Sequence, residues 1–488
     1  MRWERRVRVI LGLLAIATAC VTDPPDVPGN PDALALTIVD GDHQVSQIGQ
    51  RLPRRYVVRA TLNGTPAPNR EISWVVSVGS GRVDPSSSVT DAEGLAETTH
   101  TLGPEVGSQE VRATFAGIAE AAQVTFVTQV DPVPTPPRVA SLPIPANYGI
   151  HDTFVRDGIA FVCAWNSGII ILDVGGGGAG GAPDAPVQLA TFVTQAAPLP
   201  TPAAHNAWWF HNPVTQERRY LFVGQEGPGT IGANSSGDIH VLDVSDLANP
   251  MEVASFHLPG AGVHNFWMDE ARQVLYAAYY NGGVIALDVS GVLAGDLSGR
   301  LLANTLPGGP GNTFVWGVML VGGSLYASDM ISGFWRLDRE TLVPTGGGSN
   351  VPDRFSSDLW SAGSYAYTGT WGSREGTLGS AIKIWELAVG GPVLVDSVLV
   401  PGIRTVSDLQ VSEDGTLLVA SAEGAEGAGI YVYRLTEPTK PQLVGLVLVD
   451  TGIHTVTLAE VGGKLYAFGA KNPGDPALEI YDLSSFRP

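Results

Sequence analysis

The segment Gly168-Ile-Ile-Ile-Leu-Asp-Val174 recurs along the C-terminal part of the chain, and this repetition constrains the fold more than any other feature. Each copy is a short, mostly apolar run with a charged residue near its end. The other copies occupy residues 239–244, 284–289, 334–339, 382–387, 430–435 and 478–483. Successive copies are 70, 45, 50, 48, 48 and 48 residues apart. A nearly constant period of this length predicts a repeat architecture.

Each full repeat contains four short apolar runs that are separated by turn residues. In the first repeat they are His151-Asp-Thr-Phe-Val155, Asp157-Gly-Ile-Ala-Phe-Val162, the segment ending in Leu-Asp-Val, and Pro186-Val-Gln-Leu-Ala-Thr-Phe192. Four antiparallel strands every ~40–50 residues are typical of one blade of a β-propeller. We therefore predict a seven-bladed β-propeller over residues 138–488.

The last repeat is too short to complete a blade. Only five residues follow Leu483, so the fourth strand is missing there. The segment Pro136-Pro-Arg-Val-Ala-Ser-Leu142 has the spacing of a fourth strand but lies before the first repeat. An open ring would expose unpaired strand edges, so we expect strand 138–143 to join the last sheet and close the ring.

The repeat pattern resembles that of LVIVD-repeat proteins. It combines Gly-Ile-Ile-Ile-Leu-Asp-Val with a preceding Gly-x-Ala-Phe-Val run and a following Pro-x-x-x-Ala run, and it extends over about 350 residues. LVIVD-repeat proteins are exported bacterial propellers without a generally established activity. The resemblance therefore implies a fold and an export route, and it implies no reaction.

Residues 1–19 resemble an export signal. An arginine-rich start precedes an apolar run over residues 9–19, which is too short to span a bilayer. The run ends in Ala17-Thr-Ala-Cys20, which resembles the lipobox of bacterial lipoproteins. This resemblance implies that Cys20 is acylated and that a lipid attaches the chain to a membrane. Ordinary cleavage after Ala19 is the alternative.

The residue after Cys20 bears on the location of the mature chain. Position 21 is Val, and the Asp that favours retention in the inner membrane is absent there. We therefore expect a cell-envelope lipoprotein of the outer membrane, on its periplasmic or surface face. Residues 20–33 contain four prolines and are expected to be an extended tether.

Residues 34–130 are predicted to be a separate domain. Six apolar runs separated by turn residues in about 100 residues favour an Ig-like β-sandwich, with Trp74 in its core. The segment Thr90-Asp-Ala-Glu-Gly-Leu-Ala-Glu-Thr98 resembles bacterial Ig-like domains of the invasin/intimin type. The resemblance implies a spacer, with adhesion as the alternative. Residues 131–137 contain four prolines and predict a stiff linker.

Composition supports an all-β chain and excludes some partners. Short β-branched runs dominate, and no long stretch shows helical periodicity. The formal charge of −20 repels phosphate backbones, so nucleic acid is not an expected partner. Besides Cys20 the chain has one cysteine, Cys163, which lies in an apolar run and is expected to be a buried core residue.

A column of polar residues stands at the start of each inner strand. In a propeller these starts meet at one mouth of the central channel, so the column could hold a divalent metal or a polar ligand. Hydrogen bonding between strand starts and neighbouring loops is the alternative, and catalysis is a third. The candidate residues are His151, Asp152, His205, Asn206, His264, Asn265, Asp358, Asp408 and His454.

Large aromatic residues follow two positions after four of these Asp and Asn residues. They are Phe154, Trp208, Trp267 and Trp360. Residues two apart on a strand share a face, so these rings are expected beside the polar column. They could be a stacking platform for sugar rings, or apolar filling between blades.

The remaining motifs give little support for catalysis. The chain has no Gly-x-Ser-x-Gly, His-Glu-x-x-His or Cys-x-x-Cys motif. The glycine-rich segment 175–181 is expected to be a flexible loop, and the repeated Asp residues are expected to accept hydrogen bonds in turns.

We therefore predict a non-enzymatic, lipid-anchored cell-envelope protein without a required cofactor. Its Ig-like spacer would present the propeller as a binding or scaffolding platform. A metal-dependent envelope enzyme that uses the histidine-rich rim is one alternative. An adhesin for a glycan or an envelope protein is the other.

Overall fold

The computed structural model describes residues 33–118, 122–144, 149–424, 426–471 and 475–488. Segment 1–19, Cys20 and all but the last residue of tether 20–33 lie outside the described residues. The described chain is all-β, as the sequence predicts, and its helical elements are two three-residue turns, Ser298–Arg300 and Ser484–Phe486. No helix in the described ranges is long and apolar enough to cross a membrane.

The N-terminal part of the described chain forms two five-stranded sheets. One has the order β1-β3-β8-β6 with β4 beside β3, and the other has the order β2-β10-β9-β5-β7. The strands are β1 Leu34–Asp40, β2 Gln44–Gln47, β3 Tyr56–Leu62, β4 Thr65–Pro66, β5 Glu71–Val78, β6 Arg82–Asp84, β7 Ser87–Val89, β8 Leu95–Thr101, β9 Gly107–Phe115 and β10 Gln123–Asp131.

Aromatic side chains fill the space between these two sheets. Tyr56 of β3 stacks on Phe126 of β10 with ring centroids 4.4 Å apart, and Trp74 of β5 lies 6.0 Å from Phe126. All three side chains are buried. Large apolar residues on alternate positions of facing strands therefore hold the two sheets together, and Trp74 is the core residue that its sequence context predicts.

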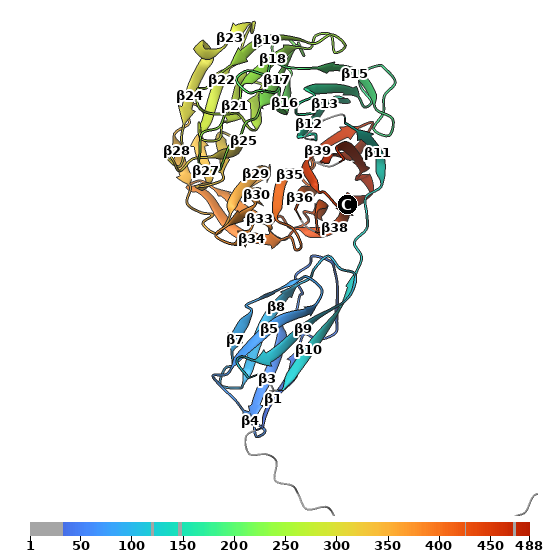
Figure 1. The fold of residues 1–488 in the computed structure, drawn as a ribbon, viewed down its shortest axis with the longest axis vertical. Helices are drawn as coiled ribbons and strands as arrows, with labels where there is room; N and C mark the ends of the chain where they lie inside the picture. The colour runs from blue at the N-terminus through green and yellow to red at the C-terminus, as the bar shows by residue number, and fades with distance from the viewer. Residues whose placement is uncertain (1–32, 119–121, 145–148, 425, 472–474) are drawn as a thin grey trace, which may run out of the picture.

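Residues 138–488 form seven sheets of four or five strands in the part of the chain that the structure describes. Figure 1 shows these sheets arranged in a ring. Each copy of the sequence repeat lies on the third strand of its sheet, counted from the inside. The third strand β14 Ile169–Asp173 is buried along its whole length, because neighbouring sheets cover both of its faces. A continuous apolar run is the sequence expected for a strand that is buried on both faces.

The inner two strands of each sheet carry the residues nearest the ring centre. The innermost strands are β12 Asp152–Arg156, β16 Ala204–Phe210, β20 Phe266–Asp269, β25 Val315–Val321, β29 Phe355–Ala362, β35 Thr405–Val411 and β39 Ile453–Val461. The second strands are β13 Ile159–Cys163, β17 Tyr220–Gln225, β21 Val274–Ala278, β26 Ser324–Asp329, β30 Tyr365–Trp371, β36 Leu417–Glu423 and β40 Lys464–Lys471.

The outer strands carry the repeat and complete each sheet. The third strands after β14 are β18 Ile239–Asp243, β22 Val284–Asp288, β27 Gly333–Asp338, β33 Ala381–Ala388, β37 Gly429–Arg434 and β41 Ala477–Asp482. The outermost are β15 Val187–Phe192, β19 Met251–Phe256, β24 Leu301–Thr305, β28 Pro344–Gly347, β34 Gly391–Leu399, β38 Gln442–Leu448 and β11 Arg138–Pro143. Strand β23 Gly295–Asp296 extends the β19 sheet, and β31 Ser373–Arg374 pairs with β32 Thr377–Leu378.

Strand β11 joins the first segment of the ring to its last sheet. It pairs antiparallel with β41, with Ala140 opposite Ile480 and Leu142 opposite Leu478. On the inside of the ring, Thr455 Oγ1 of β39 donates a hydrogen bond to the His151 carbonyl, 2.7 Å away. The ring is therefore closed both at its outer edge, by the β11–β41 strand pair, and near its centre, by the contact between the inner strands.

A buried carboxylate reinforces the outer pair. Glu479 of β41 is buried and accepts hydrogen bonds from Arg138 Nη1 at 3.1 Å and from Ser141 Oγ at 3.0 Å. Both donors belong to β11. Linker residues contribute as well, because the carbonyls of Pro134 and Pro137 accept hydrogen bonds from the Leu446 and Asp482 amides at 3.0 and 2.9 Å.

The first repeated acid organises a turn. The Asp173 carboxylate accepts hydrogen bonds from the backbone N–H groups of Gly175, Gly176, Gly177, Ala179 and Gly181. Burial opposes ionisation, but these bonds outweigh it and hold the pKa of Asp173 below its ordinary value. The segment that we expected to be a flexible loop is therefore fixed. Asp338 and Asp482 likewise accept turn N–H groups, which confirms the predicted role of the repeated acids.

We predict that the β11–β41 pair carries much of the stability of the ring. Removing both donors with Arg138→Ala and Ser141→Ala leaves the Glu479 carboxylate buried without them, and this should cost about 1–3 kcal/mol. Calorimetry would register the loss as a lower melting temperature. Adding Glu479→Leu should recover most of it, because the unpaired buried charge is then gone. An unchanged melting temperature in the double variant would contradict the role given to β11.

Candidate functional site

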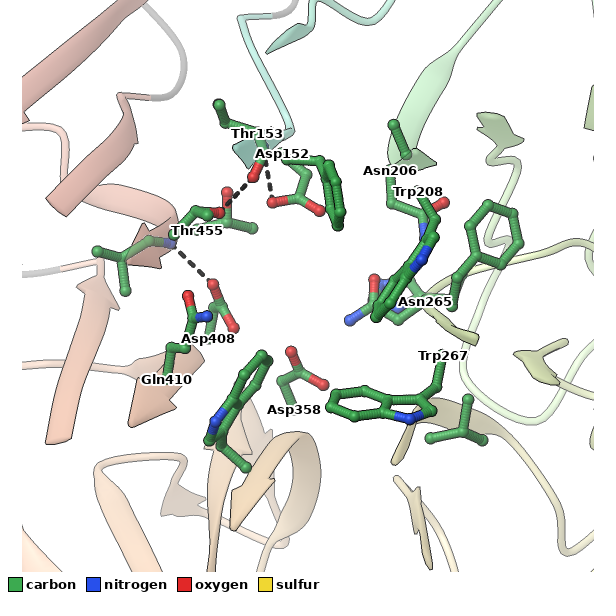
Figure 2. Close-up of a pocket in the computed structure, with 18 of the residues that line it drawn as sticks. Asp152, Thr153, Asn206, Trp208, Asn265, Trp267, Asp358, Asp408, Gln410 and Thr455 are labelled. Atoms are coloured by element: carbon green, nitrogen blue, oxygen red, sulfur yellow. Dashed lines mark hydrogen bonds between the residues drawn. The ribbon is translucent and has the colours of Figure 1, made fainter. Parts of the chain in front are cut away.

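The inner strands of the ring line a cavity of about 550 Å³. Residues from β12, β16, β20, β25, β29, β35 and β39 all contribute to its wall. Figure 2 shows labelled side chains of β12, β16, β20, β29, β35 and β39 around the cavity. The candidate residues that the sequence places on separate repeats therefore meet in one volume.

Irregular strand pairing brings two consecutive residues to the cavity. In a regular strand, neighbouring residues point to opposite faces. The register shifts between Ala204 and Asn206 on β16, so that His205 has no partner on β17. A bulge of this kind re-aims the extra side chain, and both His205 and Asn206 line the cavity. Similar shifts occur at the starts of β25, β29, β35 and β39.

Four imidazoles pack together at one end of the cavity. We call His151, His205, His264 and His454 the histidine cluster. The ring centroid of His151 lies 3.9 Å from that of His205 and 4.1 Å from that of His454. The centroids of His205 and His264 are 4.2 Å apart. The rings are thus in van der Waals contact, and three of the four side chains are buried to 5% exposure or less.

Two members of the cluster are held by a hydrogen-bond partner, and one of them has a defined tautomer. His264 Nδ1 lies 2.6 Å from the carbonyl oxygen of Trp316, and His454 Nδ1 lies 2.8 Å from Glu423 Oε1. A carbonyl can only accept, so Nδ1 of His264 carries the proton and its Nε2 keeps a lone pair. In contrast, neither nitrogen of His205 has a partner in hydrogen-bonding geometry.

A carboxylate that the sequence analysis missed lies beside the cluster. Glu226 Oε2 is 3.5 Å from His151 Nε2 and 3.7 Å from His205 Nε2. The Tyr280 hydroxyl donates a hydrogen bond to the other oxygen, Oε1. Glu226 lies two residues after Gly224, which pairs with Ile239 of the repeat strand, and Trp165 and Glu423 have the same position after Cys163 and Ser421. A column aligned on this strand pairing would have identified it.

Burial keeps most of the histidine cluster neutral. It lowers the pKa of His151, His205 and His264 well below the ordinary value, and neighbouring histidines lower it further. Burial also opposes protonation of His454, but the carboxylates of Glu423, Glu226 and Asp408 outweigh it and raise its pKa. Burial raises the pKa of Glu226 to about 7.

Asp and Asn side chains form a second ring at the next sequence position of the inner strands, and we call this ring the carboxylate layer. It comprises Asp152, Asn206, Asn265, Asp358 and Asp408. Figure 2 shows Asp152, Asp358 and Asp408 pointing into the cavity from three sides. Asp408 accepts the amides of Leu409 at 2.7 Å and Val456 at 2.8 Å, which fixes its orientation.

The three carboxyl groups are held in an environment that resists ionisation. Burial raises the pKa of Asp152 to about 7, and the neighbouring Asp408 adds to this. Burial, Asp408 and a hydrogen bond with it raise the pKa of Asp358 well above its ordinary value. Burial raises the pKa of Asp408 as well. Like charges and low local dielectric together keep a proton in this layer near neutral pH.

Four aromatic rings stand one level below the carboxylate layer, and we call them the aromatic collar. Phe154 and Trp208 have ring centroids 5.2 Å apart, Trp208 and Trp267 5.4 Å, and Trp267 and Trp360 5.7 Å. All four line the cavity and none is fully buried. The collar therefore presents partly exposed aromatic surface to whatever enters.

The cavity carries acid in excess of base. Besides the carboxylate layer, Asp269, Glu270 and Glu413 lie on its wall. Arg156 is the one Lys or Arg among the described residues that line it, and its Nη2 already pairs with Glu270 Oε2 at 3.1 Å. Negative potential is therefore focused in the channel and favours a positively charged ligand.

All nine candidate residues predicted for the channel rim line this one cavity. They separate into two levels, with the histidines packed on one another and the Asp and Asn residues beyond them. Cys163, on β13, is buried, and burial raises the pKa of its thiol well above the ordinary value. It is therefore the inert core residue that its apolar context predicts.

Comparison with known proteins identifies the fold of the ring. No known family model and no curated protein matches the sequence. The crystal structure of the WD40 β-propeller domain of Doa1 is similar with a TM-score of 0.50 and 11% identity, covering 70% of this chain and 96% of that one. The C-terminal domain is a β-propeller. A chain of the Mitotic Checkpoint Complex crystal structure is similar with a TM-score of 0.51 and 16% identity, covering 71% and 94%.

We predict that Asp358→Asn stabilises the propeller more at pH 8 than at pH 5. Asp358 and Asp408 have raised pKa values when folded, whereas unfolded Asp residues lose their protons near pH ~4. The free energy of unfolding therefore falls as pH rises through the pKa values that these groups have in the folded state. Asn keeps the contact with Asp408 without a second charge. Calorimetry at both pH values, with exposed Asp450→Asn as the control, should show this difference. An equal shift at both pH values would exclude the mechanism.

Proposed function

We propose that this protein is a binding platform whose propeller channel receives a positively charged organic group. The observation that carries the proposal is the cavity itself, in which buried carboxyl groups lie directly behind an aromatic collar. Its volume of about 550 Å³ is within the range of small-molecule sites. Asp152, Asp358 and Asp408 have no Lys or Arg partner among the described lining residues.

The two layers favour an organic cation over a small metal ion in the channel. Aromatic faces attract ammonium and guanidinium groups, most strongly where water is excluded. A single small metal ion would need several oxygen ligands within one coordination sphere. Among the described residues, Asp152, Asp358 and Asp408 do not form a group with ligand atoms all within 4.8 Å of one another. Asp358 and Asp408 bond to each other, so the three carboxyl groups do not converge on one small ion.

The domain order suggests how the channel is presented. We propose a seven-bladed propeller of LVIVD type, supported by one sheet for each repeat copy. We further propose that the two-sheet N-terminal domain is an Ig-like spacer, and that Cys20 carries the lipid anchor of a cell-envelope lipoprotein. Palmitate labelling of wild type and Cys20→Ser, followed by protease treatment of intact cells, addresses the anchor and the exposed face.

The proposed partner is an envelope protein or glycan that carries a basic group. The negative charge of the chain and the acidic wall of the channel both disfavour a phosphate-rich partner. The proposal requires no cofactor at the channel, because charge pairing and aromatic contact would supply the binding free energy.

We predict that choline binds the channel and that its uncharged isostere, 3,3-dimethyl-1-butanol, binds measurably more weakly. The two probes have the same shape, so a difference reports the charge. Titrations followed by the fluorescence of the collar tryptophans and by calorimetry would measure both affinities. Trp267→Leu should weaken choline binding roughly 2- to 30-fold, which is the range of a cation–π contact. Asp358→Asn should weaken it too.

The controls separate charge from shape. Asp450→Asn removes an exposed acid outside the cavity and should leave choline binding unchanged. Equal affinity for choline and the alcohol would contradict the cationic specificity. No binding of choline, together with glycan-array binding that Trp267→Leu abolishes, would instead identify the collar as a platform for neutral sugars.

A further inference from the structure

A second group of ligand atoms lies at the histidine-lined end of the channel. His151 Nε2, His205 Nε2 and Glu226 Oε2 belong to a set whose ligand atoms all lie within 4.8 Å of one another. Among the described residues this is the one group of three or more His, Cys, Asp or Glu side chains with that property. Its residues come from the loop before β12, from β16 and from the end of β17.

The spacing of these atoms fits a tetrahedral metal site. Zinc binds imidazole nitrogen and carboxylate oxygen at about 2.0–2.2 Å, so two ligand atoms of a tetrahedral site lie roughly 3.3–3.5 Å apart. The observed separations are 3.5 Å between His151 Nε2 and Glu226 Oε2, and 3.7 Å between His205 Nε2 and Glu226 Oε2. Side-chain movements of a few tenths of an ångström would bring these atoms into coordination.

The hydrogen bonding of the group is incomplete without an additional partner. His205 is 1% exposed, its Nε2 lies 3.7 Å from Glu226 Oε2, and neither of its nitrogens has a partner in full hydrogen-bonding geometry, although the Asn206 side chain and the His264 backbone approach its ring. Nδ1 of His151 is also buried without a partner. Buried polar atoms are normally satisfied, so orphaned nitrogens beside a carboxylate indicate a missing ligand.

The buried carboxylate of Glu226 also indicates a missing cation. Glu226 is 5% exposed and has no Lys or Arg partner among the described residues. A buried carboxylate with so little compensation is costly, and a divalent cation would offset that cost.

We propose that His151, His205 and Glu226 bind one divalent transition metal ion of the zinc class. Two imidazole nitrogens and one carboxylate oxygen suit such ions better than calcium or magnesium, which prefer oxygen ligands alone. Tyr280 holds Glu226 Oε1 and leaves Oε2 free for the metal. His264 and His454 lie outside the ligand set, because the group whose ligand atoms all lie within 4.8 Å of one another comprises His151, His205 and Glu226 and includes no atom of either residue.

Three protein ligands leave one coordination position open. His151 and His205 both line the channel cavity, so a water molecule or a donor atom of a channel ligand can reach that position. The metal would thus stand at the floor of the pocket, beyond the carboxylate layer. This placement is independent of the identity of the ligand proposed above, and it supplies the component that a metal-dependent activity would need.

The test uses the chain without a histidine tag, stripped with chelator and dialysed. We expect Zn²⁺ to bind with a stoichiometry near one by calorimetry, and Co²⁺ to give visible absorption bands typical of four-coordinate sites. His205→Gln and Glu226→Gln should each lower the affinity by at least about 100-fold, because each removes a direct ligand. Calorimetric melting of these variants shows that they remain folded.

Two variants make the ligand assignment falsifiable. His264→Gln changes a neighbouring buried histidine outside the set and should keep stoichiometric binding. His240→Gln changes a buried histidine that pairs with Glu252 on outer strands, and it controls for the loss of any buried imidazole. Absence of stoichiometric Zn²⁺ binding, or binding that survives both His205→Gln and Glu226→Gln, would overturn the proposal.

Discussion

The pairing of β11 with β41 is the contact on which the rest of the propeller depends. It joins residues more than three hundred positions apart, and its buried Glu479 is satisfied only when Arg138 and Ser141 are in place. Strand pairing leaves no free edge at the seam, and the faces of the first and last sheets can then cover each other. Without this strand pair, no outer strand would hold the first and last sheets together, and the inner strands would not be kept around a common axis.

Closure creates a channel in which polar groups are buried at high density. Each inner strand contributes few polar side chains, and a ring places them opposite one another instead of along a line. The local dielectric is low there, so the charge on each group depends strongly on its neighbours. One end consequently holds mostly neutral imidazoles around Glu226, while the next level holds acids that share protons.

The two levels are complementary in chemistry. The upper level offers nitrogen lone pairs and one carboxylate, which suit a metal ion. The lower level offers a wider ring of acids with aromatic rings beyond it, which suits an organic cation. A ligand that enters past the collar would meet the acids first and the metal position last. The pocket is thus graded from aromatic rings to acids to the proposed metal position, and a single ligand could contact all three levels.

The sequence by itself determined the all-β class, the repeated third strand and the set of polar residues that line the channel, because strand period and repeat spacing are local properties of the chain. It did not reveal Glu226, which lies outside the columns compared between the repeats, or the bulges that turn both His205 and Asn206 to the cavity. It predicted that the repeated Asp residues accept hydrogen bonds in turns, but not that Asp173 thereby fixes the glycine-rich segment that was expected to be flexible. Tautomers, shared protons and distances between ligand atoms arise only when strands far apart in sequence are brought together, so tertiary structure alone decided them.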